Sequence, residues 1–303
     1  MQNSLPNNFK FNTSKYVLVF LLITSFELIS INVKSQSKND TIKIASWNIQ
    51  MLPSIYAPFS KLVRKKQKIR CPKIVQYLNA SEFDIVILQE VFDKKREKEL
   101  LAGLSTRYPY ILNPIKEGFN LKLSSGIMIL SRYPFELIDH IIFNVSKKSD
   151  RGAQKGCSLL QINLNNKHLM IAGTHLDSKN ENSRTLQYEL TKEKIISPYI
   201  KDSIPFFLGG DFNTNMSSEG YEKMISTFGL ENHPLEDERP YTFDEFNSWN
   251  SKGYKSWIDF IFYQKNDKVK IIDQYILRPK MQYEKSSIDL ADHYQIILEA
   301  VIY

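Results

Sequence analysis

Short apolar runs, separated by polar and charged segments, recur along the chain from residue 42 to its C-terminus. Each run has the length of a strand, and most are apolar at consecutive positions rather than at alternate ones. Strands covered on both faces have this pattern, whereas half-exposed strands alternate. The predicted strands are 42–47, 85–88, 126–130, 159–162, 169–172, 206–208, 258–262 and 294–298.

Apolar residues at helical spacing occupy three of the segments between these strands, at 73–79, 94–104 and 183–199. Residues 268–271 alternate as a strand with one exposed face would. A chain with many strands and a few interspersed helices is typical of stacked sheets flanked by helices. The pattern therefore predicts an α/β sandwich.

The first 35 residues have a different pattern. Lys10 and Lys15 precede an apolar stretch at residues 16–23, and small residues suited to cleavage come before Gln36. This arrangement is typical of a secretory signal peptide at residues 1–35. An uncleaved membrane anchor is the alternative, although polar residues between positions 25 and 30 interrupt the run early for a bilayer span.

Residues 36–303 contain no low-complexity linker and no internal repeat. We therefore expect a single domain at residues 36–303, secreted to the extracellular space, or to the periplasm where the cell has an outer membrane. The formal charge is +7, and removal of the leader, with three lysines and one glutamate, leaves +5. This charge suits a phosphate-bearing or anionic-membrane partner without specifying one.

Neither the cysteines nor the basic run at residues 64–68 specifies a site. Cys71 and Cys157 lack the C-x-x-C spacing of a metal site. An oxidising compartment would allow them to form a disulfide, and the sequence leaves this open. The basic run is interpreted as a solvated helix face rather than as a binding patch.

Polar side chains stand where several of the predicted strands end. Each has an ordinary explanation as a turn residue, a helix-start charge, a buried histidine or a cap, and these alternatives stay open one by one. Their recurrence at strand ends, where catalytic groups are often found, favours a shared site. Carboxylates and amides without a thiolate fit Mg²⁺ better than zinc. The residues are Asn48, Glu90, His175, Asp211, Asn213, Asp259, Asp292 and His293.

Asp211 and Asn213 follow the apolar run at 206–208 through two glycines. In an extended segment, residues i and i+2 point to the same side, so this pair is expected to face one ligand. A simple strand-to-loop turn is the alternative, because Gly, Asp and Asn are common turn residues.

Six short stretches that carry the polar residues together resemble the endonuclease/exonuclease/phosphatase superfamily, the DNase I-like metal-dependent phosphodiesterases. The resemblance covers essentially the whole chain after the leader. It implies a four-layer α/β sandwich with two stacked mixed β-sheets flanked by helices. The stretches are Ser46-Trp47-Asn48, Leu88-Gln89-Glu90-Val91, Gly173-Thr174-His175-Leu176, Gly210-Asp211-Phe212-Asn213, Ile258-Asp259-Phe260-Ile261 and Asp289-Leu290-Ala291-Asp292-His293-Tyr294.

Further stretches are similar to the bacterial neutral sphingomyelinases within that superfamily. Phe243 stands where those enzymes have a tryptophan. The matching stretches are Trp47–Pro53 (WN-x-x-MLP), Leu88–Asp93 (LQEVFD), Arg184 with Gln187 (R-x-x-Q), and Thr242–Asp244 followed by Asn247 and Ser248 (TWD…NS).

Residues 150–156 resemble a D-x4-KG loop of the same enzymes, in which an acid and a lysine lie near the phosphate. Asp150 and Lys155 would form that pair. An exposed basic turn is the alternative interpretation, because Lys147, Lys148 and Arg151 surround the motif.

Secreted bacterial sphingomyelinases often carry a hairpin with exposed aromatic residues before the final motif. Residues 264–288 of this chain contain no tryptophan and no adjacent aromatic pair. Trp249, Tyr254 and Trp257 are the substitutes that the sequence offers for membrane contact, with burial in the core as the alternative for at least one of them.

The resemblance also implies roles for the site residues. Glu90 would be the principal ligand of Mg²⁺, or of Mn²⁺ or Co²⁺ in its place, and Asn48 and Asp292 would line the metal site. His293 would be the general base, oriented by Asp259. Asp211 would align the attacking water. His175 and Asn213 would donate hydrogen bonds to the phosphate, and Lys155 with Asp150 would bind the substrate.

The reaction implied by the resemblance is hydrolysis of sphingomyelin in membrane surfaces to ceramide and phosphocholine, by a secreted monomer. One alternative is a secreted DNase I-like nuclease, whose partner would be nucleic acid and whose activity would fall steeply with salt. Another phosphoesterase on the same fold is a further alternative. A non-catalytic binding protein is disfavoured because all six polar stretches are intact.

Overall fold

The structure is a computed structural model that describes residues 40–53, 61–146 and 148–303. Its first main sheet is mixed, because β1 and β2 run parallel while the remaining neighbours are antiparallel. The strand order is β12 (Val269–Leu277), β15 (Gln295–Ile302), β1 (Asp40–Met51), β2 (Ile85–Val91), β4 (Met128–Ser131) and β3 (Tyr110–Leu112).

The second main sheet is also mixed, with one parallel pair, β7 and β8. Its order is β11 (Asp259–Tyr263), β8 (Phe206–Asp211), β7 (Lys167–His175), β6 (Gly156–Leu164) and β5 (Phe135–Ile142). Two small hairpin-like sheets pair β9 (Phe243–Asp244) with β10 (Lys255–Ser256) and β13 (Lys280–Tyr283) with β14 (Ser286–Asp289).

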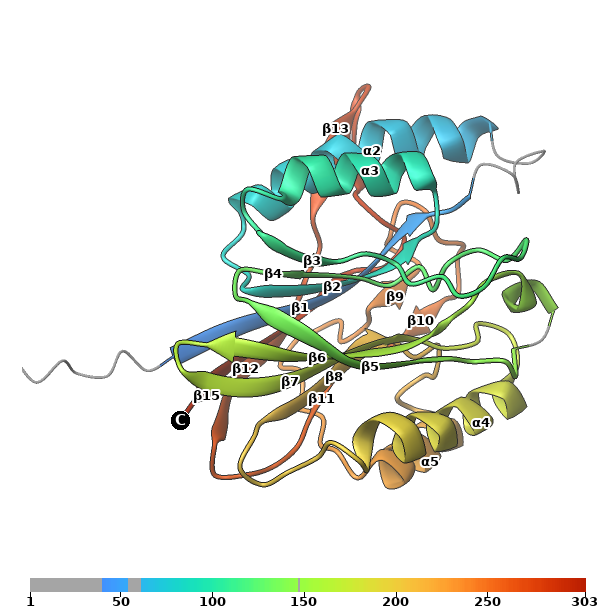
Figure 1. Cartoon of the computed structure of the whole chain (residues 1–303). Helices are drawn as coiled ribbons and strands as arrows, with labels where there is room; N and C mark the ends of the chain where they lie inside the picture. Colours follow the sequence, from blue (N-terminus) through green and yellow to red (C-terminus); the bar gives the residue numbers. More distant parts are fainter. Residues whose placement is uncertain (1–39, 54–60, 147) are drawn as a thin grey trace, which may run out of the picture. The chain divides into compact units, whose positions relative to one another are not determined.

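Helices cover the outer face of each main sheet (Figure 1). The first sheet is covered by α2 (Lys61–Ala80) and α3 (Lys94–Leu104), and the second by α4 (Glu181–Thr191) and α5 (Glu219–Phe228). A 3-10 helix, η2 (Lys148–Gly152), precedes β6, and a π-helical turn, η3 (Lys192–Ile196), follows α4. The layers are therefore helix, sheet, sheet, helix, which confirms the expected four-layer α/β sandwich.

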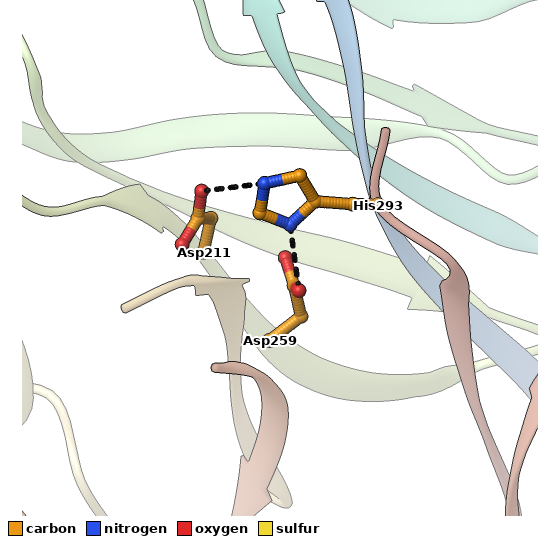
Figure 2. Close-up of side chains that lie close together, drawn as sticks. All are labelled: Asp211, Asp259 and His293. Carbon is orange, nitrogen blue, oxygen red and sulfur yellow. Dashed lines mark hydrogen bonds and ion pairs between the residues drawn. The ribbon is translucent and has the colours of Figure 1, made fainter. Parts of the chain in front are cut away.

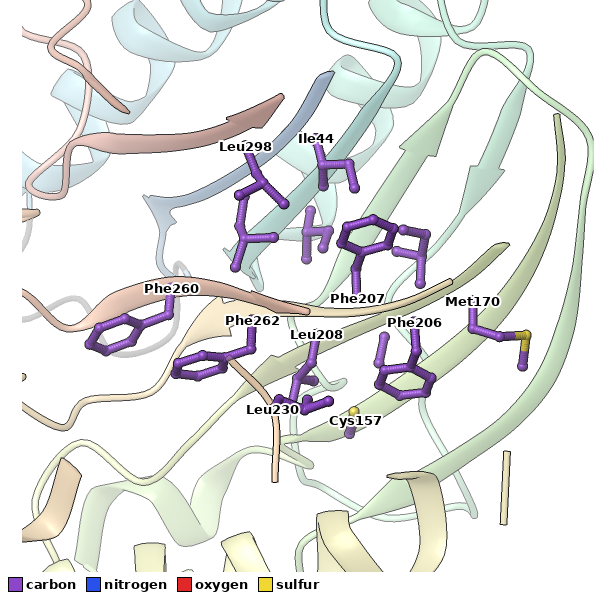
Figure 3. Close-up of a cluster of buried hydrophobic side chains, with 14 of the residues drawn as sticks. Ile44, Cys157, Met170, Phe206, Phe207, Leu208, Leu230, Phe260, Phe262 and Leu298 are labelled. Atoms are coloured by element: carbon purple, nitrogen blue, oxygen red, sulfur yellow. The ribbon is translucent and has the colours of Figure 1, made fainter. Parts of the chain in front are cut away.

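The consecutive apolar positions of the central strands are explained by burial on both faces. Ile44 of β1 belongs to the core between the two sheets, whereas the next residue, Ala45, packs toward α2 and α3. In Figure 3, Phe207 of β8 points toward Ile44 and Leu298 of the first sheet. Successive strand residues face opposite sides, so every position of such a strand is apolar.

The two sheets approach closely beside the strand ends. A Cβ atom on Gly209 would lie 2.7 Å from the Cδ1 atom of Ile87, and one on Gly173 would lie 2.9 Å from its Cγ2 atom. Neither glycine could carry a Cβ atom unless the Ile87 side chain shifted. These two glycines therefore allow Ile87 of the first sheet to pack directly on the backbone of the second.

All eight predicted strands overlap observed strands, and 94–104 coincides with α3. The predicted helix 183–199 is replaced by α4 and the π-helical turn η3, and 73–79 is the end of the longer α2. The helix α5 was not predicted, because two serines precede it and a glycine lies in its first turn, and these residues are typical of loops.

Cys71 and Cys157 are both free and buried. Cys71 lies between the first sheet and its helices, whereas Cys157 lies in the core that includes the second sheet. The disulfide that the sequence left open is therefore absent. Among the residues described, no helix is long and apolar enough to span a bilayer. The predicted leader lies outside the described residues.

Candidate active site

The parallel pairs of strands bring the predicted polar residues to one edge. Since β1 runs parallel to β2 and β7 parallel to β8, the carboxyl ends within each pair coincide. In the second sheet, Asp211 is paired in register with His175 on one side and with Asp259 on the other. Residues paired across neighbouring strands point to the same face, so these three side chains lie together.

His293 lies between two carboxylates (Figure 2). Its Nδ1 atom is 2.9 Å from the Oδ2 atom of Asp259, and its Nε2 atom is 3.8 Å from the Oδ2 atom of Asp211. The indole nitrogen of Trp47 donates to its carbonyl oxygen at 3.0 Å. Burial by itself would lower the pKa of His293, but the carboxylates of Asp259 and Asp211 raise it well above its usual value.

Asp211 connects the two sheets at this edge. Its Oδ2 atom accepts a hydrogen bond from the side-chain amide of Asn48 at 3.0 Å and lies 3.4 Å from the Nε2 atom of His175. Both Asp211 and Asn48 are almost fully buried. The structure therefore brings together residues from three of the polar stretches, on both sheets.

The expected extended geometry at Asp211 and Asn213 is wrong. Strand β8 ends at Asp211, and Asn213 adopts a left-handed conformation with φ of 50°. The Oδ1 atom of Asp211 accepts a hydrogen bond from the Asn213 backbone N–H at 2.9 Å, which closes a tight turn. Asn213 instead directs its side-chain amide to the carbonyl oxygen of Leu176, at 3.2 Å.

A second group of carboxylates comes from β2 and from the segment before β15. The side-chain amide of Gln50 donates to the Oδ2 atom of Asp292 at 2.6 Å, while the Oδ1 atom of Asp292 is buried without a hydrogen-bond partner. Burial, together with the charge of Asp292, raises the pKa of Glu90 to about 7. Glu90 and Gln50 both have left-handed backbones, with φ of 60° and 50°.

The donor atoms of this second group fit a hard divalent cation. Two carboxylates that repel each other, one with an unpartnered buried oxygen, favour a positive charge between them. Asp211, Asp259 and His293 also place one potential ligand atom each within 4.8 Å of one another. There, the 2.9 Å bond joins the Nδ1 atom of His293 to the Oδ2 atom of Asp259, and the Oδ1 atom of Asp259 is buried without a hydrogen-bond partner. Both groups therefore offer a buried carboxylate oxygen without a partner to a cation.

Lys155 and Asp150 form a buried ion pair, with 3.0 Å between Nζ and Oδ2. The alternative of an exposed basic turn is therefore excluded for these two side chains. The Lys155 ammonium also contacts the His175 Nε2 atom and the Leu176 carbonyl oxygen, both at 2.9 Å. Burial, together with the charge of Lys155, lowers the pKa of His175 well below its usual value, so His175 is neutral.

Arg184 and Gln187 position the loop that follows β7. Gln187 accepts a hydrogen bond from the backbone N–H of Asp177 at 2.8 Å, and Arg184 donates to the carbonyl oxygen of the same residue at 3.1 Å. Asp177 itself follows His175 and Leu176 in the sequence. The R-x-x-Q stretch is thus a support for the site rather than part of it.

The stretch from Thr242 to Ser248 anchors the other side. The hydroxyl oxygen of Thr242 accepts hydrogen bonds from the backbone N–H groups of Ile258 and Asp259, both at 3.1 Å. Phe243 packs against the ring of His293 with 5.0 Å between centroids. Asn247 donates to the carbonyl oxygen of Ala291 at 3.0 Å. These contacts fix the segments that carry Asp259 and His293.

Sequence reasoning assigned no role to Gln50 or Arg70. The buried guanidinium of Arg70 donates to the carbonyl oxygens of Ile49 and Gln50, at 3.1 and 2.8 Å, and to that of Leu290 at 2.8 Å. It thereby ties the end of β1 to the Asp292 segment. Gln67 and Arg70 are three residues apart and share a helix face, but only the structure shows that this face is buried.

The three aromatic residues that the sequence offers for membrane contact differ in exposure. Trp257 is buried and donates to the carbonyl oxygen of Asp259 at 2.8 Å, so it is excluded from membrane contact. Trp249 is half-buried and donates to the carbonyl oxygen of Asp289. Tyr254 is exposed and packs edge-on against Phe243.

Residues 45–279 match the sequence model of the Endonuclease/Exonuclease/phosphatase family. The chain belongs to this family. Its polar strand ends, which meet at one edge of two stacked sheets, are those of a phosphoesterase.

Two curated proteins that are similar to this chain have the names of phospholipid-cleaving enzymes. "Sphingomyelinase C 2" of Leptospira interrogans is 27% identical over 294 residues, which cover 87% of this chain and 46% of the relative. "Phospholipase C" of Staphylococcus aureus is 26% identical over 305 residues, which cover 88% of this chain and 89% of the relative. The chain thus spans about half the length of the Leptospira protein.

Solved structures share the fold. Beta toxin from Staphylococcus aureus superposes with a TM-score of 0.74 at 21% identity, covering 86% of this chain and all of that chain. A double mutant of beta toxin with bound magnesium ions gives 0.69 at 20% identity, covering 86% and 99%. A mannosyl-6-phosphatase from Bacteroides thetaiotaomicron gives 0.66 at 20% identity, covering 86% and 100%.

Proposed function

We propose that the chain is a secreted, divalent-metal-dependent phosphodiesterase that hydrolyses sphingomyelin to ceramide and phosphocholine. The observation that carries hydrolysis is the buried pair of His293 and Asp259, which lies beside the oxygen cluster of Glu90 and Asp292. A base next to a cation site is what phosphodiester cleavage requires. The names of the relatives and the matching sequence stretches support the choice of lipid.

Glu90, with Asn48 and Asp292, would hold the cation, Mg²⁺ in the first instance and Mn²⁺ or Co²⁺ as substitutes. When bound, a divalent cation there neutralises phosphate charge, stabilises the leaving alkoxide and lowers the pKa of the nearby imidazolium. The polar atoms present fit this group, since the Oδ1 atom of Asp292 has no other partner.

His293 would act as the general base through its Nε2 atom, which receives a proton from the attacking water. Asp259 keeps the ring in one orientation and tautomer by accepting from Nδ1, and it stabilises the positive charge that forms. Asp211, 3.8 Å from Nε2, would align the water.

The two side chains that we propose to bind the phosphate, Lys155 and Asn213, donate to the same carbonyl oxygen. The Lys155 ammonium and the Asn213 amide both donate to the carbonyl oxygen of Leu176, at 2.9 and 3.2 Å. We infer that the phosphate takes over these hydrogen bonds when it enters, while Asp150 keeps Lys155 in place. The Nε2 atom of neutral His175 accepts from the Lys155 ammonium at 2.9 Å, so the expected hydrogen bond from His175 to the phosphate would require Lys155 to turn away from it first.

The test is an assay of the purified protein on sphingomyelin, phosphatidylcholine, inositol phospholipids and plasmid DNA, with Mg²⁺ and with EDTA. We expect Mg²⁺-dependent release of phosphocholine from sphingomyelin. His293→Ala is expected to abolish turnover with an unchanged circular dichroism spectrum. His168→Ala is the matched control, because this exposed histidine lies at the other end of β7. DNA nicking without phosphocholine release would overturn the sphingomyelinase proposal.

A nuclease on the same fold is the second candidate, and the net charge of +5 without the leader is the observation that favours it. Its activity would fall steeply with salt, because cations are released when phosphates are contacted. Another phosphoesterase is the third candidate, and release of inorganic phosphate from sugar phosphates would identify it.

We also propose that residues 1–35 are removed and that residues 36–303 act as one monomeric domain. Mass spectrometry of the protein exported from its own cells is expected to show Gln36 at the N-terminus. An intact N-terminus in the membrane fraction would instead identify an anchor.

A further inference from the structure

Phe119 and Leu121 are the most exposed large apolar side chains among the residues that the structure describes, and both are fully exposed. They occupy the tip of the connection between β3 and β4, in which residues 116–122 are all exposed. Single exposed apolar residues are ordinary, but two fully exposed ones at one protruding tip indicate an interaction surface.

Residues 115–125 of this connection, called the 115–125 loop, are held by hydrogen bonds at the neck and at the tip. The backbone N–H of Ser125 donates to the carbonyl oxygen of Ile115 at 2.7 Å, which closes the neck of the loop. The side chain of Gln154 accepts from the backbone N–H of Glu117 at 3.0 Å and donates to its carbonyl oxygen at 2.8 Å. At the tip, Asn120 accepts from the backbone N–H of Lys122 at 2.9 Å.

The loop stands on the rim of the candidate active site. Its neck is bonded to Gly152, through the backbone N–H of Leu123, and to Gln154, the residue before Lys155. At its end, the carbonyl oxygen of Gly126 accepts from the backbone N–H of Val91, the residue after Glu90. Figure 1 shows the β3–β4 connection at the end of the sheets where β1 and β2 terminate.

Basic side chains flank the apolar tip. Lys116, Lys122 and Arg151 are exposed, whereas the acidic Glu117 is paired with His140, 2.6 Å from its Nε2 atom. An apolar tip with a basic surround is the composition of segments that enter the boundary between headgroups and acyl chains. A protein partner would need a shaped, matching hollow, whereas fluid lipid accepts two projecting side chains without one.

We propose that the 115–125 loop is the membrane-docking element of this protein, with Phe119 and Leu121 inserted into the outer part of a phospholipid bilayer. Docking through this loop would hold the mouth of the active site at the level of the lipid phosphates. The inference deepens the proposed function and rests on it for the lipid nature of the substrate.

The test measures vesicle binding separately from turnover. The protein and its Phe119→Ser/Leu121→Ser variant are sedimented in EDTA with vesicles of phosphatidylcholine and sphingomyelin, with and without phosphatidylserine. The variant is expected to bind the vesicles at least about tenfold more weakly than the unmodified protein, because it loses two side chains that can insert into the bilayer. Ile272→Ser is the matched control, since this exposed residue of β12 lies outside the loop.

Activity distinguishes docking from damage to the site. The double variant is expected to hydrolyse a short-chain sphingomyelin below its micelle concentration at the normal rate, and sphingomyelin vesicles much more slowly. Lys116→Gln/Lys122→Gln is expected to weaken binding mainly to vesicles with phosphatidylserine, and less so at high salt.

Three results would overturn the proposal: no vesicle binding by the unmodified protein, equal binding by the double variant, or a dimer that the double variant converts to a monomer. The last result would assign the tip to self-association. If the protein bound vesicles through Phe119 and Leu121 but cleaved no sphingomyelin, the docking surface would stand and the proposed substrate would fall.

Discussion

Three non-glycine residues in the candidate site, Gln50, Glu90 and Asn213, have left-handed backbones. Such conformations are disfavoured for residues with a Cβ atom, and they persist only where the surroundings hold them. Arg70 binds the carbonyl oxygen of Gln50, and Asp211 binds the backbone N–H of Asn213. At the residue scale, three of the six non-glycine residues with left-handed backbones in the described part of the chain therefore lie where the chemistry is proposed to occur.

Glu90 makes the metal-free protein sensitive to pH. Burial and Asp292 raise its pKa from 4.5 to about 7, so ionisation of Glu90 opposes folding. Without metal, stability is expected to fall as the pH rises from about 4.5 through about 7. Glu90→Gln removes this loss and is expected to add on the order of 1–3 kcal/mol near pH 8 in EDTA, measured by urea denaturation.

In EDTA, Glu90→Gln is expected to be more stable than the unmodified protein, and Mg²⁺ is expected to reverse this order of stability. It should raise the midpoint of thermal unfolding of the unmodified protein near pH 8 and have little effect on Glu90→Gln, because binding to the folded state stabilises it. Glu82→Gln is the control, because the side chain of Glu82 is highly exposed. Equal stabilisation of Glu90→Gln by Mg²⁺ would contradict the ligand assignment.

Asp259→Asn tests the orientation of His293. The amide no longer stabilises a positive ring, so kcat is expected to drop by about 10²-fold or more. Because Asp259 raises the pKa of His293, the acidic limb of the pH–rate profile should move to lower pH. A loss of stability without movement of that limb would indicate a purely structural role.

At the element scale, the strand ends are fixed by loops that are distant in sequence. Thr242 binds the start of β11, and Arg184 and Gln187 bind the loop after β7. The strands were predictable because their apolar runs reflect burial on two faces. The π-helical turn was not, because its conformation depends on packing against the second sheet. The prediction also missed α5, although Tyr221, Met224 and Phe228 recur there at helical spacing.

Thr242→Val keeps the shape of the side chain but removes its hydroxyl. Two backbone N–H groups, those of Ile258 and Asp259, lose their acceptor, so the expected loss of stability is about 1–3 kcal/mol. A lower kcat is also expected, as Asp259 becomes less well placed. Thr227→Val on the exposed face of α5 is the matched control, and similar effects of the two changes would contradict the anchoring role.

At the scale of the whole molecule, the site depends on how closely the two sheets pack. Gly209 and Gly173 let Ile87 rest on the second sheet, next to the edge where Asn48 reaches Asp211. The sheets are therefore joined at the site by both apolar contact and a buried hydrogen bond.

Gly209→Ala is expected to cost about 1–3 kcal/mol, because its Cβ atom would lie 2.7 Å from the Cδ1 atom of Ile87. Ile87→Val removes that methyl group, so the double variant should recover part of the loss. A double-mutant cycle by urea denaturation measures this coupling. Additive losses would show that the two residues do not limit the approach of the sheets.

The sequence by itself determined the fold class, the strands and the set of polar strand ends, because burial on two faces and chemistry at strand ends leave local patterns. It also contained the stretches that resemble sphingomyelinases. The assembly of the site was decided only by tertiary structure: the register that sets His175, Asp211 and Asp259 side by side, and the support from Arg70 and Thr242. Those contacts join residues far apart in the chain, and the left-handed turn at Asn213 replaced the extended geometry expected there. The exposure of Phe119 and Leu121 likewise follows from where the neck of their loop is bonded, which no local pattern records.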